Sequence, residues 1–320
     1  MKRLKILITG ASGFIGTNLL QFFLDKRYEV LNIDFNPPQN KAHLKYWSNV
    51  DITKYEILEK CILEFGADYV VHLAARTDLD GKIIEDYNAN IIGVQNILDS
   101  LKKSKKIKRV IFASSQLVCS GRMPMNDNDY NTVNVYGESK KQGELIIKND
   151  HEIPFEWVIV RPTSIWGPWF REPYHRFFNM IINKRYFHFG NKSCSKTYGY
   201  IKNIIYQLDT ILETPNNKIQ GKVFYLGEYE PTNIYNWANE IASELKISIK
   251  VIPFSLIKLA AFVGDLLITI GIKFPMTSFR LKNMTTDNII DLSKTKEIAP
   301  NLPYSRIQGI RETLKWLKIK

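Results

Sequence analysis

Residues 4–16, LKILITGASGFIG, form an apolar run that leads into three glycines, Gly10, Gly13 and Gly16. The apolar residues predict a buried strand, and the glycines predict a tight turn at the start of a helix. Because glycine lacks a Cβ, a diphosphate can lie against the backbone amides and the positive end of that helix. On their own, the glycines are also compatible with an ordinary glycine-rich loop.

A second predicted strand strengthens the first interpretation. It spans residues 29–33 and ends in Asp34, a carboxylate about 20 residues beyond the glycines, where the ribose hydroxyls of an adenosine would be held. Strand, glycine turn, helix and carboxylate together predict a dinucleotide-binding site. The charge of Asp34 would repel a 2′-phosphate, so NAD is favoured over NADP.

Predicted strands and helices alternate along the first half of the chain. This pattern predicts an α/β fold with a Rossmann-type, doubly wound parallel sheet and ligands at the carboxyl ends of its strands. We expect the sheet domain to span residues 1–165, with residues 198–228 returning to it. A smaller, mainly helical substrate-binding lobe would comprise residues 166–197 and 229–320. The further strands are predicted at 69–73, 109–113, 155–160 and 223–226, and the main helices at 51–64, 88–101, 134–149, 198–212 and 310–317.

The charge balance indicates an anionic small-molecule substrate. The chain has 44 Lys and Arg against 32 Asp and Glu, a net charge of +12. The lysines are scattered, and no zinc-finger spacing or helix-turn-helix signal accompanies them, so no nucleic-acid partner is expected. Metal-ligand spacing is also missing, and no metal site is predicted.

Three cysteines, Cys61, Cys119 and Cys194, are far apart in the sequence. Their odd number and spacing argue against a disulfide framework and favour a reducing compartment. The chain runs from Met1 straight into the first predicted strand, which leaves no room for a signal peptide. A cytoplasmic protein is expected.

Residues 253–275, PFSLIKLAAFVGDLLITIGIKFP, are strongly apolar. Lys258, Asp265 and Lys273 interrupt them, and no unbroken apolar span reaches the length that a bilayer requires. We predict a helix packed on the lobe and no stable membrane insertion. Contact with a membrane surface or a lipid-linked substrate is the alternative for this segment.

Tyr136 and Lys140 are four residues apart and therefore lie on one face of a predicted helix. A tyrosine has an ordinary pKa of about 10, and a neighbouring cation would favour the phenolate. The positive ring of an oxidised nicotinamide would act in the same direction. Ser115, at the end of a strand, could bond the substrate oxygen that Tyr136 deprotonates.

These motifs, taken together, resemble the extended short-chain dehydrogenase/reductase family, in its NAD-dependent nucleotide-sugar epimerase/dehydratase branch. The resemblance covers about the first 230 residues and is vaguer beyond them. It rests on the glycine turn at 10–16, Asp34, Asp51-Ile52, residues 72–75 (HLAA), Ser114-Ser115, Tyr136 with Lys140, Arg161-Pro162 and Gly167-Pro168.

The resemblance implies a role for each matching position. The NAD-binding residues would be Gly10, Gly13, Phe14, Ile15, Gly16, Asp34, Asp51, Ile52, Leu73, Ala74, Ala75, Tyr136 and Lys140. Ser115, Tyr136 and Lys140 would be the catalytic residues. Ser115 would also contact the sugar, with Ser164, Lys196 and Arg280 as further substrate-binding candidates.

One departure from the family's sequence pattern limits the reactions that we expect of this protein. In the family's 4,6-dehydratases the catalytic hydroxyl precedes an Asp-Glu pair that eliminates water, whereas Gln116-Leu117 follows Ser115 here. Since neither side chain can transfer a proton, dehydration is disfavoured. Thr163-Ser164 also stands where many relatives have an asparagine for the substrate diphosphate.

The leading hypothesis is therefore an NAD-dependent epimerase of a nucleotide-diphosphate sugar, acting at C4 of a UDP-hexose or related sugar through a transient keto-sugar. The alternative is an NAD(P)-dependent reductase or dehydrogenase of a keto-sugar or of a lipid-linked or steroid-like alcohol. A non-catalytic NAD sensor is a third hypothesis, disfavoured by the intact triad. The resemblance also implies a homodimer, with the helices at 88–101 and 134–149 as the interface.

Overall fold

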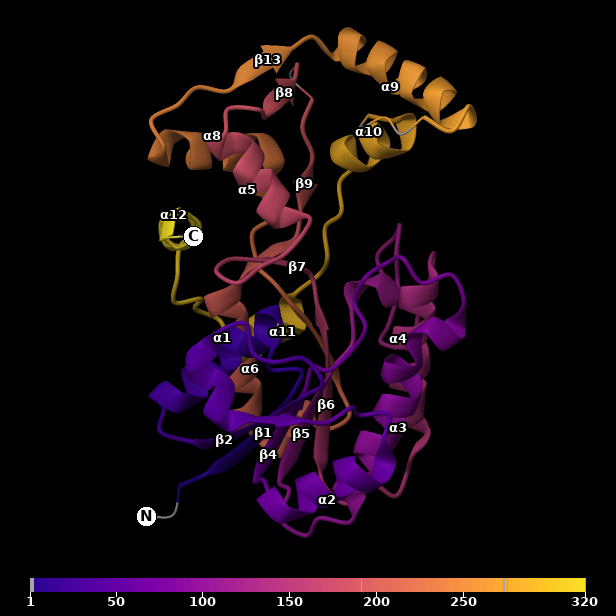
Figure 1. The fold of residues 1–320 in the computed structure, drawn as a ribbon, viewed down its shortest axis with the longest axis vertical. Helices are drawn as coiled ribbons and strands as arrows, with labels where there is room; N and C mark the ends of the chain where they lie inside the picture. Colours follow the sequence, from indigo (N-terminus) through magenta and orange to yellow (C-terminus); the bar gives the residue numbers. More distant parts are fainter. Residues whose placement is uncertain (1–2, 191, 273, 275, 320) are drawn as a thin grey trace.

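The computed structural model describes residues 3–190, 192–272, 274 and 276–319. Within them, seven parallel strands form one sheet in the order β11-β6-β5-β4-β1-β2-β3 (Figure 1). The predicted doubly wound α/β fold is confirmed. The strands are β1 (Lys5–Thr9), β2 (Glu29–Asp34), β3 (Trp47–Asn49), β4 (Tyr69–His72), β5 (Arg109–Ala113), β6 (Glu156–Pro162) and β11 (Val223–Leu226).

Helices cover both faces of this sheet, as Figure 1 shows. On one face lie α1 (Phe14–Asp25) and α6 (Ile201–Glu213), and on the other α2 (Tyr55–Phe65), α3 (Asn88–Lys102) and α4 (Val135–Asn149). Because helices cover both faces, the central strands are buried on both sides. Continuous apolar runs such as residues 6–8 suit that environment.

Three local predictions were wrong in detail. The edge strand β3 was missed, because its three residues, WSN, carry no apolar run. The helix expected to start at Asp51 begins four residues later, since an Asp51 carboxylate oxygen accepts the Thr53 amide at 2.9 Å and closes a turn first. Residues 198–200, expected to be helical, form the strand β10 (Tyr198–Tyr200), which pairs in parallel with β7 (Ser164–Trp166).

The rest of the chain adds short elements and a mainly helical lobe above the sheet in Figure 1. In the described ranges, no helix combines the length and apolar character needed to cross a membrane. The elements are the 3-10 helices η1 (Lys41–Tyr46), η2 (Ile84–Tyr87) and η3 (Gln116–Val118), the strands β8 (Phe187–Phe189), β9 (Ser195–Lys196), β12 (Thr232–Asn233) and β13 (Lys250–Ile252), and the helices α5 (Tyr174–Ile182), α7 (Asn216–Ile219), α8 (Ile234–Glu244), α9 (Phe254–Thr269), α10 (Ser278–Thr285), α11 (Ser293–Ile298) and α12 (Arg306–Ile319).

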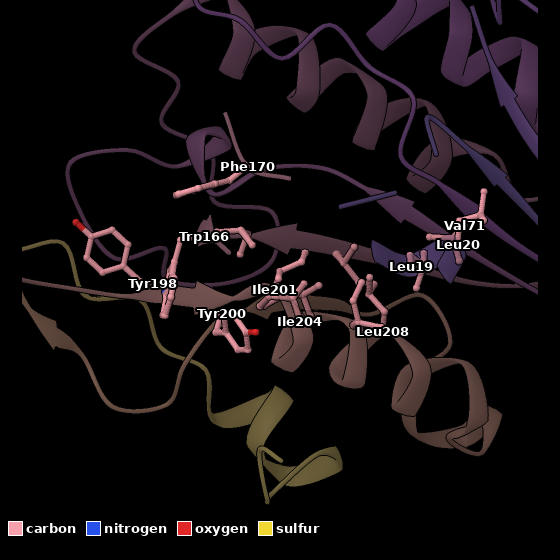
Figure 2. Close-up of a cluster of buried hydrophobic side chains, with 14 of the residues drawn as sticks. Leu19, Leu20, Val71, Trp166, Phe170, Tyr198, Tyr200, Ile201, Ile204 and Leu208 are labelled. Carbon is pink, nitrogen blue, oxygen red and sulfur yellow. The ribbon is translucent and has the colours of Figure 1, made fainter. Parts of the chain in front are cut away.

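One of the hydrophobic clusters of the described residues joins the sheet to the lobe. It begins under α1 with Leu19 and Leu20 and continues through Trp166 and Tyr200, the paired last residues of β7 and β10, to Trp237 of α8. Figure 2 shows part of this cluster, where α6 packs beside β7 and β10. The lobe is therefore anchored on the sheet by buried apolar contacts.

The register of the sheet brings the ends of its strands to one edge. Thr9 pairs with Ile33 on one side and with His72 on the other, and His72 pairs with Phe112. Ala113, one residue further along, pairs with Val160. The residues that follow these positions in sequence must therefore emerge side by side, as in other open α/β sheets that bind ligands there.

Candidate functional site

A cleft of about 900 Å³ opens at this edge of the sheet. Every residue predicted to bind the cofactor or to act in catalysis lines it. These are Gly10, Gly13, Phe14, Ile15, Gly16, Asp34, Asp51, Ile52, Leu73, Ala74, Ala75, Ser115, Tyr136 and Lys140.

The glycine turn forms the floor of the cleft. Gly10 has a φ of +76°, and a Cβ added to it would lie 2.6 Å from the backbone nitrogen of Ala74, so only glycine fits without displacing the backbone of the next segment. Gly13 begins helix α1 with no side-chain cap. The first amides of α1 therefore keep their capacity to bind an anion.

Asp34, at the end of β2, has its carboxylate held by backbone amides. One oxygen accepts the Ser12 amide at 3.1 Å and the other accepts the Asn36 amide at 2.9 Å. Burial raises the pKa of Asp34, while these hydrogen bonds and the positive charge of Arg171 oppose that rise. The carboxylate is thus fixed in orientation beside the glycine turn.

The next two predicted segments form further parts of the wall. Ile52 is buried, and its carbonyl accepts the side-chain amide of Asn96 of α3 at 3.0 Å. Beyond β4, the amide of Ala74 donates to the hydroxyl of Thr9 at 3.2 Å, and that hydroxyl lies 2.7 Å from Nδ1 of His72. His72 is fully buried and packs within the sheet, as expected from its place in a strand.

Ser115, Tyr136 and Lys140 converge on the opposite side of the cleft. Tyr136 and Lys140 lie one turn apart on α4, whose amino end is capped by Asn134 through a 2.7 Å bond to the Gly137 amide. Ser115 caps the short helix η3 by accepting the Leu117 amide at 3.1 Å. A Cβ on Gly137 would lie 2.4 Å from the Leu117 carbonyl oxygen, so this glycine allows α4 and η3 to approach.

Burial dominates the electrostatics of these groups. It raises the pKa of Tyr136 to about 12, and a hydrogen bond with Ser115 opposes this rise. It lowers the pKa of Lys140 to about 8, while the nearby charge of Glu144 acts in the opposite direction. In the protein without cofactor, the pKa of Tyr136 is therefore raised and not lowered, contrary to the expectation from the neighbouring lysine. The expected effect of the nicotinamide charge concerns the NAD-bound state.

The ammonium of Lys140 is oriented by a hydrogen bond of 2.8 Å to the carbonyl oxygen of Ala113, at the end of β5. Lys140 is 5% exposed and Tyr136 is 8% exposed, so both side chains are held by packing. This rigidity is what positions a general acid or base for a bound substrate.

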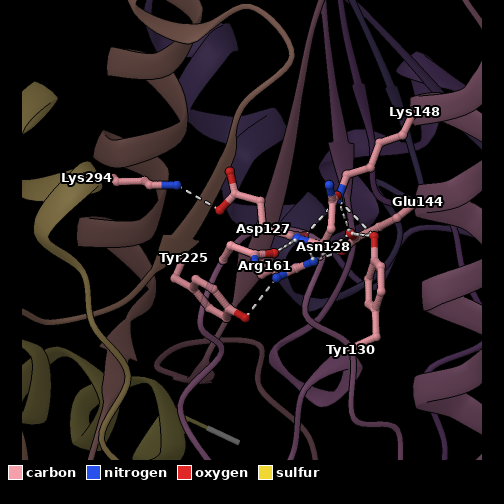
Figure 3. Close-up of polar contacts among 9 residues, drawn as sticks. Asp127, Asn128, Tyr130, Glu144, Lys148, Arg161, Tyr225 and Lys294 are labelled. Carbon is pink, nitrogen blue, oxygen red and sulfur yellow. Dashed lines mark hydrogen bonds and ion pairs between the residues drawn. The ribbon is translucent and has the colours of Figure 1, made fainter.

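A buried ionic network secures α4 to the sheet (Figure 3). Arg161 of β6 donates to both carboxylate oxygens of Glu144 at 2.7 Å, to the Tyr225 hydroxyl at 3.0 Å and to the Asp127 carbonyl at 2.9 Å. Lys148, one turn further along α4, lies 3.2 Å from the same carboxylate. The network thus joins α4, β6, β11 and the loop before α4.

Of the three further substrate-binding candidates, Ser164 lies next to the cleft. It accepts the side-chain amide of Gln116 at 3.2 Å, between cleft residues Thr163 and Ile165. The other two belong to β9 and α10. The ammonium of Lys196 donates to the carbonyl of Asn283 at 2.7 Å. Arg280 lies exposed on α10. None of these three is among the described residues that line the cleft. Their roles in substrate binding stay predictions.

The cleft also contains residues that sequence reasoning missed. Arg76, Thr77 and Asp78 follow β4 beyond the predicted Ala75. Arg171 and Glu172 come from the segment before α5, and Tyr174 is the first residue of α5. The first group could have been found by extending the strand-end argument by a few residues. Arg171 and Glu172 lie in an irregular segment with no periodic signal, so only the fold places Arg171 near Asp34.

The comparisons with known proteins agree with this geometry. One relative is the N-acetyl-alpha-D-glucosaminyl-diphospho-ditrans,octacis-undecaprenol 4-epimerase of Escherichia coli O157:H7, 27% identical over 97% of this chain and 94% of the relative. Another is the 3-beta-hydroxysteroid dehydrogenase of Mycolicibacterium neoaurum, 26% identical over 74% of this chain and 69% of that protein.

The fold also matches a solved structure over nearly its whole length. The UDP-glucuronic acid 4-epimerase of Bacillus cereus, crystallised with UDP-glucuronic acid and NAD, superposes with a TM-score of 0.75 and covers 99% of both chains at 23% identity. The model of the NAD dependent epimerase/dehydratase family matches residues 6–227, more than two thirds of the sequence. The chain belongs to the NAD dependent epimerase/dehydratase family, as the resemblance implied.

Proposed function

We propose that this protein is an NAD-dependent 4-epimerase of a sugar carried on a diphosphate, with a UDP-sugar as the leading substrate. The observation that carries the proposal is the convergence of Ser115, Tyr136 and Lys140 on the same cleft as the glycine turn and Asp34. An acid-base group beside a dinucleotide site is what oxidation and reduction of a sugar hydroxyl require.

The residues of the cleft fit the cofactor. The turn at Gly10, where a Cβ would collide with the backbone of Ala74, leaves the uncapped start of α1 as the site for the diphosphate. Asp34 would hold the adenosine ribose, Asp51 and Ile52 the adenine, and residues 73–75 would line the path to the nicotinamide. When bound, NAD supplies a reversible hydride acceptor, so that a transient keto-sugar can be formed and reduced without net redox change.

The chain's own residues would manage the proton and the substrate oxygen. The Tyr136 phenol would take the proton of the C4 hydroxyl and return it at the end of the turnover. Ser115, which already interacts with Tyr136, would orient the same substrate oxygen. Lys140, held by the Ala113 carbonyl, would place its charge beside Tyr136 and the nicotinamide ribose. Gln116, next to Ser115, offers no acid or base for a dehydration.

The carrier of the sugar has two candidates. A nucleotide is supported by the solved UDP-glucuronic acid 4-epimerase, whose fold this chain shares. A polyprenyl lipid is supported by the undecaprenol-linked 4-epimerase, which aligns over 97% of the chain. Both carriers present a diphosphate next to the sugar, so the same cleft chemistry applies to each. Ser164, Lys196 and Arg280 remain proposals for contacts to that diphosphate.

The experiment is a product assay on the purified protein without added cofactor. UDP-glucose, UDP-galactose, their N-acetyl and glucuronate forms, and a polyprenyl-diphosphate N-acetylhexosamine would each be incubated and separated by chromatography. Interconversion of C4 epimers in this assay supports the proposal. In a parallel assay with added NADPH, its stoichiometric consumption would instead favour the reductase alternative, for which the steroid dehydrogenase relative gives support. The Tyr136→Phe variant serves as the inactive control.

Assembly is proposed separately from the reaction. We infer a homodimer formed through α3 and α4, which pack beside each other on one face of the sheet. A mass of twice 37.2 kDa in sedimentation equilibrium would support it. A single-chain mass at micromolar concentration would overturn it and leave the epimerase proposal untouched.

A further inference from the structure

Helix α9 presents a row of large apolar side chains to solvent. Between 40% and 59% of the residue surface is exposed at each of Leu256, Leu259, Phe262, Val263, Leu266 and Ile268. Ile270 and Ile272 after the helix, and Phe279 of α10, are exposed by 69%, 50% and 75%. We call these nine residues the α9 apolar face. In Figure 1 it belongs to the end of the lobe that lies farthest from the sheet.

The fold does not need this row for its own core. Helix α9 packs inward through Ile257 and Ala261, which join Phe189 and Leu281 in a small buried cluster. An Asp265 carboxylate oxygen accepts the Ser278 amide at 3.0 Å and fastens α9 to α10. The inward stripe follows the i, i+4 spacing of one helical face, so the apolar face is held outward.

Basic residues lie on the same two helices as the apolar face. Helices α9 and α10 carry Lys258, Arg280 and Lys282 and one acidic residue, Asp265, which the contact to Ser278 already engages. Lys258 and Lys192 are exposed, and their ammonium groups lie 5.2 and 5.9 Å from the centre of the Phe254 ring at the start of α9. Lys282 is exposed in the last turn of α10. The partner of this surface should therefore be apolar inside and anionic outside.

We propose that the α9 apolar face binds the surface of an anionic lipid bilayer, with α9 lying in the plane of the headgroups. An apolar helix face with lysines at its border is the pattern of helices that lie in the interface, where acyl chains receive the apolar side chains and anionic headgroups attract the lysines. At 16 residues the helix is suited to lying on a bilayer rather than crossing it.

A second copy of the chain fits this surface less well. Pairing the α9 apolar face with itself would bring together two copies of α9 and α10, which carry three basic residues to one acidic residue. Like charges at close range oppose such a contact unless anions lie between them. A bilayer of anionic lipids supplies both the apolar volume and the opposite charge. The proposal concerns this surface alone and does not depend on the sugar reaction.

The test is flotation of the full chain with lipid vesicles. We expect the protein to float with vesicles of 70% phosphatidylcholine and 30% phosphatidylglycerol, and at least tenfold less with pure phosphatidylcholine. The variant Leu259→Ser/Phe262→Ser/Leu266→Ser should lose at least tenfold in binding to the anionic vesicles. Lys258→Glu/Lys282→Glu should lose binding mainly at low salt, because salt screens the lysine attraction.

A matched control removes exposed apolar side chains elsewhere. Ile57 and Leu63 lie on α2 at the opposite end of the molecule, exposed by 60% and 40%. Ile57→Ser/Leu63→Ser should float like the unchanged protein, and all variants should keep its melting temperature. Equal flotation of the triple variant would overturn the proposal. The proposal would also be overturned if the unchanged protein failed to float but formed a dimer in sedimentation, and the triple variant abolished that dimer.

Discussion

The guanidinium of Arg161 donates hydrogen bonds of 2.7 Å to both oxygens of the Glu144 carboxylate, one helical turn along α4 from Lys140. Both partners are at most 2% exposed. The pair therefore connects the end of β6 to the helix that carries Tyr136. It also places a buried negative charge near the ammonium of Lys140.

Removing the charge of Glu144 should destabilise the protein strongly. In Glu144→Gln, Arg161 stays buried without its counter-charge, and breaking a buried pair on one side costs about 3–5 kcal/mol. Urea unfolding would measure this loss. The matched control is Glu64→Gln, which removes a partner from the exposed pair with Lys60 and should change the free energy of unfolding by less than about 0.5 kcal/mol. Equal losses in the two variants would contradict the role assigned to the network.

Gly137→Ala should impair catalysis without unfolding the chain. The new Cβ would lie 2.4 Å from the Leu117 carbonyl oxygen, so α4 and η3 must move apart. This movement increases the distance between Tyr136 on α4 and Ser115 at the start of η3. A misplacement of about 1 Å can cost about 100-fold in rate, so kcat should fall to that extent while NAD binding changes little. Steady-state kinetics and NAD titration would check this. Lys141→Ala, on the same helix but more exposed, should keep nearly full activity.

Lys140→Met should make the cofactor-free protein more stable near pH 7. Burial lowers the pKa of Lys140 from 10.5 to about 8. Below pH 8 the lysine is charged in both the folded and unfolded states, so the cost of burying the charge is present in full. Between pH 8 and 10.5 the unfolded chain still binds the proton and the folded chain does not, so stability rises with pH there.

The variant lacks this titration, so its advantage over the unchanged protein should shrink by about 3 kcal/mol as pH rises from 7 to 10.5. Urea unfolding of both proteins at a series of pH values would measure it. A constant difference across that range would contradict the lowered pKa of Lys140. Turnover should be lost in the variant at every pH, because the ammonium is absent.

The sequence predicted most of the sheet, and the gathering of the glycine turn and Asp34 at one cleft, because both rest on local signals. Residues 110–113 of β5 are a continuous apolar run, and each loop that follows such a strand must reach the same edge of a parallel sheet. Gly10 and Asp34 were found by their spacing from those strands. The edge strand β3 was missed because its polar residues gain their structure from pairing with β2.

The substrate side was harder to predict, because its residues meet through tertiary packing. Arg171 of the irregular segment before α5 and Tyr174, the first residue of α5, line the cleft because the chain there packs around the aromatic core of Trp166 and Phe170. The partner of Arg161 is a helical glutamate 17 residues away, with no motif to connect them. Likewise, the lysine at 196 was chosen by family position, whereas its ammonium bonds the carbonyl of Asn283.

Asp34→Asn should weaken the preference for NAD over NADP. The carboxylate is fixed by the Ser12 and Asn36 amides at the position proposed for the ribose hydroxyls, so its charge should repel a 2′-phosphate there. The asparagine keeps the size and one acceptor oxygen but loses the charge. We expect the ratio of NADP to NAD dissociation constants to fall at least tenfold, which corresponds to about 1.4 kcal/mol. Calorimetric titration with each dinucleotide would measure it.

Asp51→Asn is the matched control, since Asp51 lines the same cleft but its oxygen is engaged by Thr53. The ratio of NADP to NAD dissociation constants should change less than about twofold in this variant. An unchanged ratio in Asp34→Asn, or an equal change in Asp51→Asn, would show that Asp34 does not select the cofactor.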